Sequence, residues 1–135
     1  RGYTGDVTRT IPASGKFSGP QADIYDLVHS ALQLATSKAK PEVSLDDLHD
    51  AVVKHLTRGL VDLKILRGSV PDLIAEGKFR KFYMHRTSHW LGLDVHDAGV
   101  YRANGKSTPL VPGLVPSAAT ARFTGWPPVM ICASS

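Results

Sequence analysis

The chain has 135 residues, of which 42% are hydrophobic and 21% are charged, a composition typical of a single globular domain. No apolar run approaches the roughly 18 residues that a membrane-spanning helix needs, so no membrane span is expected. A single cysteine, Cys132, excludes an intrachain disulfide framework and a zinc site built from several cysteines. We therefore expect a reducing compartment and a cytoplasmic location.

The net charge of +4 is distributed in a way that does not favour nucleic-acid binding. Three of the sixteen Lys and Arg residues follow residue 97, which leaves thirteen against all twelve acidic residues in residues 1–97. The tightest basic group is formed by Lys78, Arg80 and Lys81, which we interpret as a solvated edge. Because a nucleic-acid site usually gathers its basic residues on one element, no nucleic-acid partner is expected.

The first half of the chain predicts a strand and then helices. Residues 1–17 alternate small, polar and β-branched residues and end in turn signals, which predicts a strand followed by a tight turn. Ser18 is the expected N-cap of an amphipathic helix that Pro41 ends. The apolar stripe of this helix comprises Ile24, Leu27, Val28, Ala31, Leu32 and Ala35.

Two further helices have recognisable starts. Ser44, followed three residues later by Asp47, approximates a capping box, with Gly59 weakening the end of the helix that it opens. Ser69 is expected to open a short third helix that ends near Gly77. The apolar face of the second helix comprises Leu48, Ala51, Val52, Leu56 and Leu60. The histidines of these helices, His29, His49 and His55, are interpreted as surface or boundary residues.

The second half changes character. Residues 79–101 are dense in aromatic and β-branched residues, which predicts extended structure. The remainder is rich in Pro and Gly with little periodicity, which predicts mostly irregular chain.

Three histidines fall within twelve residues of this part: His85, His89 and His96. Imidazoles beside Asp94 and Asp97 suit a divalent transition metal or proton transfer near neutral pH. A helix would place all three on one face, whereas on a strand His96 points away unless the chain bends, for which Gly92 is the candidate. Partly buried histidines with satisfied hydrogen bonds remain the alternative to a functional site.

Two segments, SHWLGLDVHD at Ser88–Asp97 and GYTGDVTRT at Gly2–Thr10, resemble the aminopeptidase P branch of the pita-bread metallopeptidases. The intervening KFSGPQADIYDLV is similar to the same family, and the likeness extends from residue 1 to about Gly113. The resemblance implies an α+β fold: part of a pita-bread domain, with two or three helices packed on an antiparallel sheet.

The resemblance also implies a chemistry. Family enzymes hold two divalent ions, usually manganese, and release an N-terminal residue that precedes proline. By position, Asp6 and His89 correspond to metal ligands, His96 to a histidine that contacts the substrate and the developing oxyanion, and His85 to one lining the pocket for the penultimate proline. The implied partners are peptides with proline at the second position.

The departures from the family decide what we expect of this chain alone. The family's first aspartate ligand would precede Arg1, and no Asp or Glu follows Asp97, so both ligand glutamates are missing. We expect a partial catalytic domain at residues 1–115 and a non-family, irregular tail at 116–135. We also expect the chain to be inactive alone, weakly stable and prone to self-association. The alternative is a non-catalytic module that binds peptides or a protein partner.

Two smaller departures concern glycine. Arg86 and Glu42 stand where the family usually has glycine. We expect a strained or altered backbone at Arg86 and a tolerated surface turn at Glu42.

Overall fold

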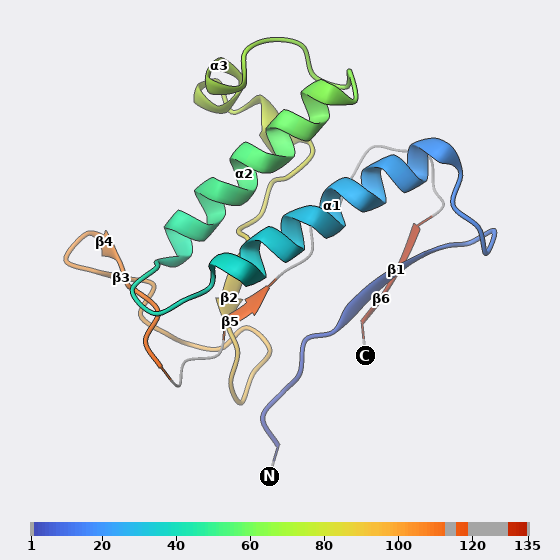
Figure 1. The fold of residues 1–135 in the computed structure, drawn as a ribbon. Coiled ribbons are helices and arrows are strands. Elements are labelled where there is room, and N and C mark those ends of the chain that lie inside the picture. The colour runs from blue at the N-terminus through green and yellow to red at the C-terminus, as the bar shows by residue number, and fades with distance from the viewer. Residues whose placement is uncertain (1, 113–115, 119–129, 135) are drawn as a thin grey trace.

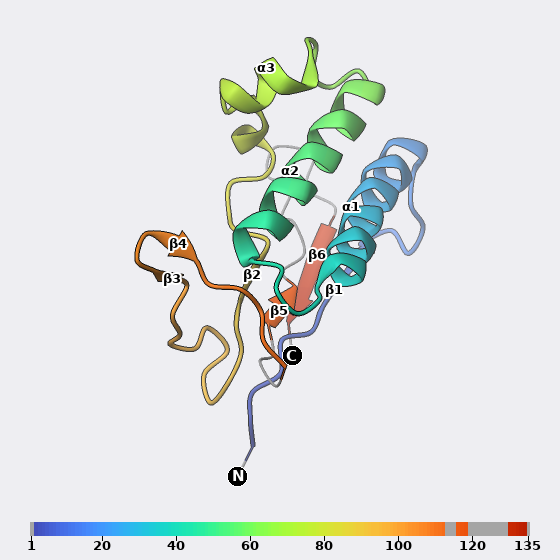
Figure 2. The same cartoon turned by 60° about the vertical axis from the view of Figure 1, so that its left-hand side comes forward.

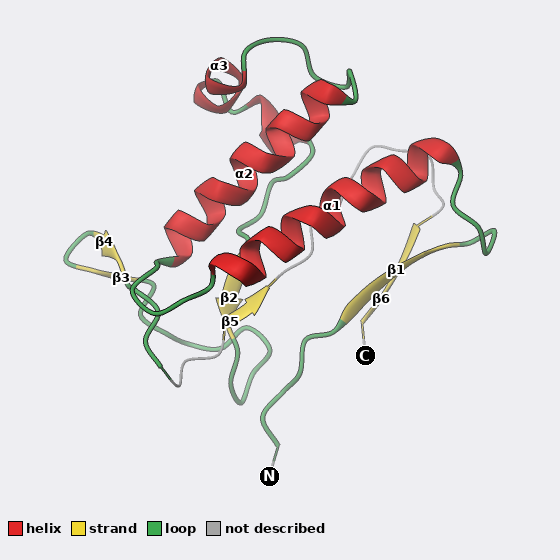
Figure 3. Ribbon diagram, in the orientation of Figure 1, coloured by secondary structure: helices red, strands yellow, loops and turns green. Residues whose placement is uncertain are grey.

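The structure is a computed structural model that describes residues 2–112, 116–118 and 130–134. Three helices gather on one side and short strand pairs on the other (Figures 1 and 3). The helices are α1 (Gly19–Lys38), α2 (Leu45–Asp62) and α3 (Val70–Ala75), followed by the 3₁₀ helix η1 (Lys78–Lys81). The expected α+β class with up to three helices is confirmed. Within the described ranges, no helix combines the length and apolar character that crossing a bilayer would require.

All strand pairs are antiparallel, and each forms its own two-stranded sheet in the described residues. The pairs are β1 (Thr8–Pro12) with β6 (Met130–Ser134), β2 (Ser88–Trp90) with β5 (Pro116–Ala118), and β3 (Arg102–Ala103) with β4 (Lys106–Ser107). In register, Thr8 lies opposite Ser134 and Ser88 lies opposite Ala118. Strands from the two ends of the chain therefore lie side by side.

Helices α1 and α2 form an antiparallel hairpin, with α3 beyond the far end of α2 (Figures 1 and 2). Gly59 lies inside α2, and a Cβ placed on it would be 2.2 Å from Cδ1 of Leu27 on α1. The missing side chain thus lets the two helices approach closely. Their shared core comprises Ala31, Ala35, Val52, Val53, Leu56, Phe79 and Tyr83.

The predicted helix starts are confirmed by their hydrogen bonds. The Gln21 side chain accepts from the Ser18 backbone N–H at 2.9 Å, which fixes the start of α1. At the start of α2, Ser44 Oγ accepts from the Asp47 N–H at 3.1 Å, and Asp47 Oδ2 accepts from the Ser44 N–H at 3.0 Å. The hydrogen bond from the Ser44 side chain, and then that from its backbone, hold the pKa of Asp47 below its usual value. At α3, Ser69 Oγ accepts from the Asp72 N–H at 3.3 Å.

A second apolar cluster joins the start of α2 to β2. It comprises Leu45, Leu48, Trp90 and Leu110, with Val43 packed against it. The backbone supports this junction, because the Leu110 N–H donates to the Val43 carbonyl and the Glu42 N–H donates to the Leu110 carbonyl, both at 2.9 Å. The strand that carries His89 is therefore anchored to the helical hairpin through its neighbour Trp90.

A chain of hydrogen-bonded polar side chains begins at Tyr83, in the core shared by α1 and α2. The Tyr83 hydroxyl lies 2.7 Å from Thr87 Oγ1, and His49 Nδ1 on α2 lies 3.0 Å from the same oxygen. Tyr83 and Thr87 are both buried. Burial raises the pKa of Tyr83 and lowers the pKa of His49, in each case as the largest cause. His49 is thus a boundary residue, as expected, with a buried partner.

The expectation of extended chain over residues 79–101 is wrong for most of its length. The segment begins in η1, forms only the three-residue β2, and then turns. Phe79 and Tyr83 pack into the helical core, and this burial outweighs their preference for strands.

The expectation of mostly irregular chain after residue 101 is also wrong in part. Asn104 and Gly105 have φ values of 51° and 76° and form the two-residue turn of the β3–β4 hairpin. Residues 116–118 and 130–134, within the expected irregular tail, are the strands β5 and β6. The rest of that tail lies outside the described residues.

The two departures at glycine positions have opposite outcomes. Among the described residues, the non-glycine residues with positive φ are Glu42, Lys64 and Asn104, so the strained backbone expected at Arg86 is not found. Glu42, in contrast, has a φ of 75°, the left-handed conformation that glycine adopts readily. The turn tolerates glutamate at a conformational cost.

Replacing Glu42 with glycine is expected to raise the free energy of unfolding by ~1 kcal/mol, because the left-handed strain disappears while the backbone hydrogen bond to Leu110 remains. Equilibrium unfolding in urea measures the change. The matched control, Glu42→Ala, removes the same carboxylate but keeps Cβ, so it should give no gain. Equal stabilisation by both variants would contradict the backbone explanation.

His49 makes stability depend on pH. Its pKa is lowered from 6.5 by burial, with Asp50 opposing that shift and His85 and Arg80 adding to it. Below pH 6.5 the unfolded chain binds a proton at His49 that the folded chain does not bind until lower pH. The stability that the neutral histidine contributes is therefore present above that pH and is lost as the pH falls through the folded pKa.

His49→Gln is expected to flatten the decline in the free energy of unfolding between about pH 7 and pH 5. Urea unfolding at several pH values in this window, compared with the wild type, measures the slope. His29→Gln, on the exposed side of α1, is the matched control. Identical slopes for the wild type and His49→Gln would show that the buried hydrogen bond to Thr87 carries no such linkage.

Candidate functional site

The site begins with the orientation of His89 on β2. Its Nδ1 lies 3.0 Å from the Trp90 carbonyl oxygen. Because a carbonyl can only accept, Nδ1 carries the hydrogen and donates it, which leaves Nε2 facing away from the strand. The strand is held in turn by the burial of the Trp90 ring against α2.

The N-terminal segment lies against the chain just after β2. The Thr4 N–H and the Thr4 hydroxyl both donate to the Gly92 carbonyl at 2.9 Å. This contact places Asp6 Oδ2 3.0 Å from His89 Nε2. The two side chains are largely shielded from solvent, with exposed fractions of 23% for Asp6 and 13% for His89.

A tight turn after Trp90 brings His96 back to His89. The Asp97 N–H donates to the Trp90 carbonyl at 3.0 Å, and its carboxylate accepts from the N–H groups of Leu93 at 2.8 Å and Ala98 at 2.7 Å. The His89 and His96 ring centroids are consequently 4.2 Å apart, with the rings tilted by 34°.

The bend lies where the sequence analysis placed it, at Gly92. A Cβ on this residue would be 1.8 Å from Asp97 Oδ2, so only glycine leaves room for that carboxylate. The strand alternative with a bend is therefore correct, and the helix alternative for the three histidines is wrong.

His85 lies beside Tyr83, next to the start of the buried polar chain. The two rings meet edge to face, with centroids 5.0 Å apart, and His85 Nδ1 donates to the Arg86 carbonyl at 2.9 Å. Of the four residues singled out from the sequence, the structure thus brings Asp6 and His96 each into contact with His89. His85 has a separate, partly aromatic environment.

The donor set fits a divalent transition metal. With Nδ1 donating to a carbonyl, Nε2 of the His89 ring lies 3.0 Å from Oδ2 of Asp6, a separation at which an imidazole nitrogen and a carboxylate oxygen can bind the same ion. A second hydrogen bond that fixes the ring is the usual arrangement for a ligating histidine. Within the described ranges, no group of three or more potential ligands is assembled.

Two residues that position the site were not singled out from the sequence. Asp97 was noted only as a neighbour of His96, yet it closes the turn; its place one residue after that histidine was the available signal. Thr4 gave no signal, since its partner Gly92 lies 88 residues further along the chain.

Comparison with known proteins gives a consistent family. The profile of metallopeptidase family M24 matches residues 1–121. The chain is 47% identical over 115 residues to the Xaa-Pro aminopeptidase of Escherichia coli K12, covering 85% of this chain and 26% of that protein. It is 52% identical over 99 residues to the Xaa-Pro aminopeptidase of Haemophilus influenzae, covering 73% and 23% respectively.

The fold agrees with solved structures of the same group. Zinc-substituted E. coli aminopeptidase P in complex with product superimposes with a TM-score of 0.81 at 46% identity, covering 86% of this chain and 26% of that one. A variant of the same enzyme, solved in complex with substrate, matches with the same TM-score, identity and coverage. The chain thus spans about a quarter of the length of the relatives that it matches.

The family match covers most of the chain, and the superposition places its helices and strands within the expected architecture. The chain therefore belongs to metallopeptidase family M24 and forms part of the pita-bread fold of aminopeptidase P.

Proposed function

We propose that this chain supplies Asp6, His89 and His96 to the site of a metal-dependent aminopeptidase that releases an N-terminal residue preceding proline. The observation that carries the proposal is the contact of these three side chains, which come from opposite ends of the segment similar to Xaa-Pro aminopeptidases. If Asp6 only capped a turn, its carboxylate would have no need of Nε2 of His89 opposite it.

In this proposal Asp6 and His89 would be ligands of the two divalent ions, with manganese as the expected metal, that the full-length family enzyme holds; this chain alone is not expected to hold both ions. The ions, when bound, lower the pKa of a water and polarise the scissile carbonyl. The Trp90 carbonyl holds His89 in the tautomer that presents Nε2 to the metal. His96 is exposed beside His89, so its imidazole can reach a substrate and donate a hydrogen bond to a developing oxyanion.

The proposed substrates are peptides with proline at the second position. Solved complexes of the E. coli relative with substrate and with product support a peptide ligand. His85 is proposed to line the proline pocket. Its edge-to-face contact with Tyr83 and its hydrogen bond to the Arg86 carbonyl hold its ring in one orientation, against which an apolar proline ring can pack.

The 135-residue polypeptide alone is proposed to be inactive, because its described residues bring together one carboxylate and one imidazole where two adjacent divalent ions need several anionic oxygens. Asp97 does not add to this supply, since both of its oxygens accept backbone N–H groups of the turn.

Further expectations from the sequence stay predictions. Self-association is supported by exposed apolar side chains at Ile11, Leu93 and Val100, which are 58%, 72% and 63% exposed. The cytoplasmic location and the division at residue 115 also remain predictions, and the family match extends to residue 121.

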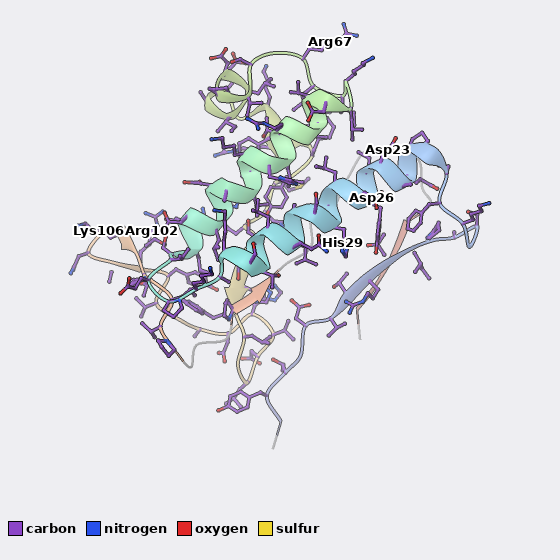
Figure 4. All side chains as sticks on the ribbon, in the orientation of Figure 1. Asp23, Asp26, His29, Arg67, Arg102 and Lys106 are labelled. Carbon is purple, nitrogen blue, oxygen red and sulfur yellow. The ribbon has the colours of Figure 1, made fainter. Side chains whose placement is uncertain are left out.

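Metal binding tests the proposed ligands directly. Asp6→Asn and His89→Ala are each expected to weaken Mn²⁺ binding by about tenfold or more, the loss that follows even from removing an outer-shell partner. Isothermal titration calorimetry of the purified chain measures this. His29→Ala, on α1 (Figure 4), removes an exposed histidine whose ring is hydrogen-bonded to Gln33 and should leave affinity unchanged. Equal affinities in all variants would rule out these two ligands.

Hydrolysis tests the rest of the proposal. The isolated chain, supplied with Mn²⁺, is expected to give no turnover of an Xaa-Pro peptide above a metal-only control. Robust turnover that His89→Ala abolishes would refute the argument from carboxylate supply. Saturable peptide binding without metal and without turnover would instead support the alternative of a non-catalytic module.

A further inference from the structure

A second polar site lies at the start of α2, beside the β3–β4 hairpin. It is a pocket of about 240 Å³. Residues far apart in the sequence line it: Leu45, Asp46, Arg86, Ser88, Tyr101, Arg102 and Ser107. Figure 4 labels Arg102 on the hairpin, at the opposite end of α2 from Arg67.

Two arginines share a single carboxylate in this pocket. Arg86 Nη2 contacts Asp46 Oδ1, and Arg102 Nη2 lies 2.5 Å from Asp46 Oδ2. Asp46 is in the first turn of α2, whereas the arginines are 40 and 56 residues away along the chain. Two guanidinium groups against one carboxylate leave one positive charge without compensation from this cluster.

Among the described residues, most of the donors on these guanidinium groups have no protein acceptor. Each guanidinium has five N–H donors. Within the part of the chain that the structure describes, Arg86 uses Nη2 for Asp46, and Arg102 uses Nη2 for Asp46 and Nη1 for the Gly105 carbonyl at 3.4 Å. Neither arginine makes the bidentate contact that a carboxylate can accept, so an N–H edge of each can meet a ligand.

The surroundings favour a negative ligand. Burial, and then the proximity of Arg102, lower the pKa of Arg86, which shows that the two positive charges repel each other across the pocket. The Tyr101 oxygen accepts from the Trp90 N–H at 3.1 Å, which leaves its own hydrogen for donation. Ser107 adds a hydroxyl from β4.

We propose that this pocket binds a small oxyanion, a carboxylate or a phosphate group, held between Arg86 and Arg102. Planar guanidinium groups suit this ligand because they bind oxyanions through two parallel hydrogen bonds. The proposal does not rest on the proposed peptidase function. Ser88 lines the pocket while His89, next along β2, faces Asp6, as expected for neighbours on opposite faces of a strand.

The test titrates the metal-free chain, prepared by dialysis against a chelator, with inorganic phosphate and with acetate at constant ionic strength. Calorimetry or amide shifts report binding. Arg86→Ala and Arg102→Ala are each expected to weaken the tighter ligand by about tenfold or more, because each removes charge-assisted hydrogen bonds. Arg67→Ala is the matched control, since it removes an equal charge at the far end of α2, and it should leave the affinity unchanged.

Asp46→Asn separates a ligand site from a purely structural ion pair. It removes the internal competitor for both arginines, so it is expected to tighten oxyanion binding severalfold. Weaker binding by Asp46→Asn, with the circular dichroism of the folded chain retained, would overturn the proposal.

The remaining outcomes are also decisive. Tighter phosphate indicates a phosphorylated ligand, and equal or tighter acetate indicates a carboxylate; both support an oxyanion site. Arg102 lies on the exposed two-residue strand β3, so the Arg102→Ala variant should fold even if the Arg86→Ala variant does not. Saturation by neither probe, or equal affinity for the wild type and Arg102→Ala, would refute the site.

Discussion

One carbonyl oxygen, that of Trp90, determines the geometry on which the candidate site depends. It accepts a hydrogen bond from His89 Nδ1 and another from the Asp97 N–H, each at 3.0 Å. The first bond sets the tautomer and direction of the His89 ring, and the second closes the turn that returns His96. The Trp90 side chain is buried against Leu45, Leu48 and Leu110, so the oxygen is fixed by the same packing that joins β2 to α2. The packing of α2 against β2 thereby determines how the imidazoles of His89 and His96 lie relative to each other.

The site also needs a contribution from a distant part of the chain. The two hydrogen bonds from Thr4 to the Gly92 carbonyl set the register of the N-terminal segment against the turn, and that register places Asp6 opposite His89. The contact joins residues 88 apart, so the loop that it closes contains the whole helical hairpin, and closing it costs more conformational entropy than a local contact would. The proposed ligand pair therefore depends on a long-range contact across α1 and α2, although neither helix supplies a member of the pair.

How much of the fold and of the candidate site could be predicted from the sequence depends on how far apart in the chain the interacting residues lie. The helix starts at Ser18, Ser44 and Ser69 were predicted because capping bonds join residues three apart. The bend at Gly92 was predicted as one of two alternatives, because His89 and His96, which it brings together, lie on either side of it in the sequence. The β3–β4 hairpin was missed although Asn104–Gly105 is a strong local turn signal. The pairing of Arg86 and Arg102 with Asp46 could not be predicted, because nothing local specifies partners 40 and 56 residues away.

The acidic residues near the histidines illustrate why composition alone overstates a metal site. Asp6 and Asp97 both lie near His89 and His96, and by residue type either could be a ligand. The carboxylate of Asp97 accepts two backbone N–H groups in a turn so tight that Gly92 cannot carry a Cβ. Moving it onto a metal would leave the Leu93 and Ala98 N–H groups without acceptors and would open the turn that positions His96. Asp97 therefore serves the geometry of the candidate site, which leaves Asp6 as the proposed ligand, and a metal centre with more ligands than the proposed Asp6 and His89 must draw its further carboxylates from outside this turn.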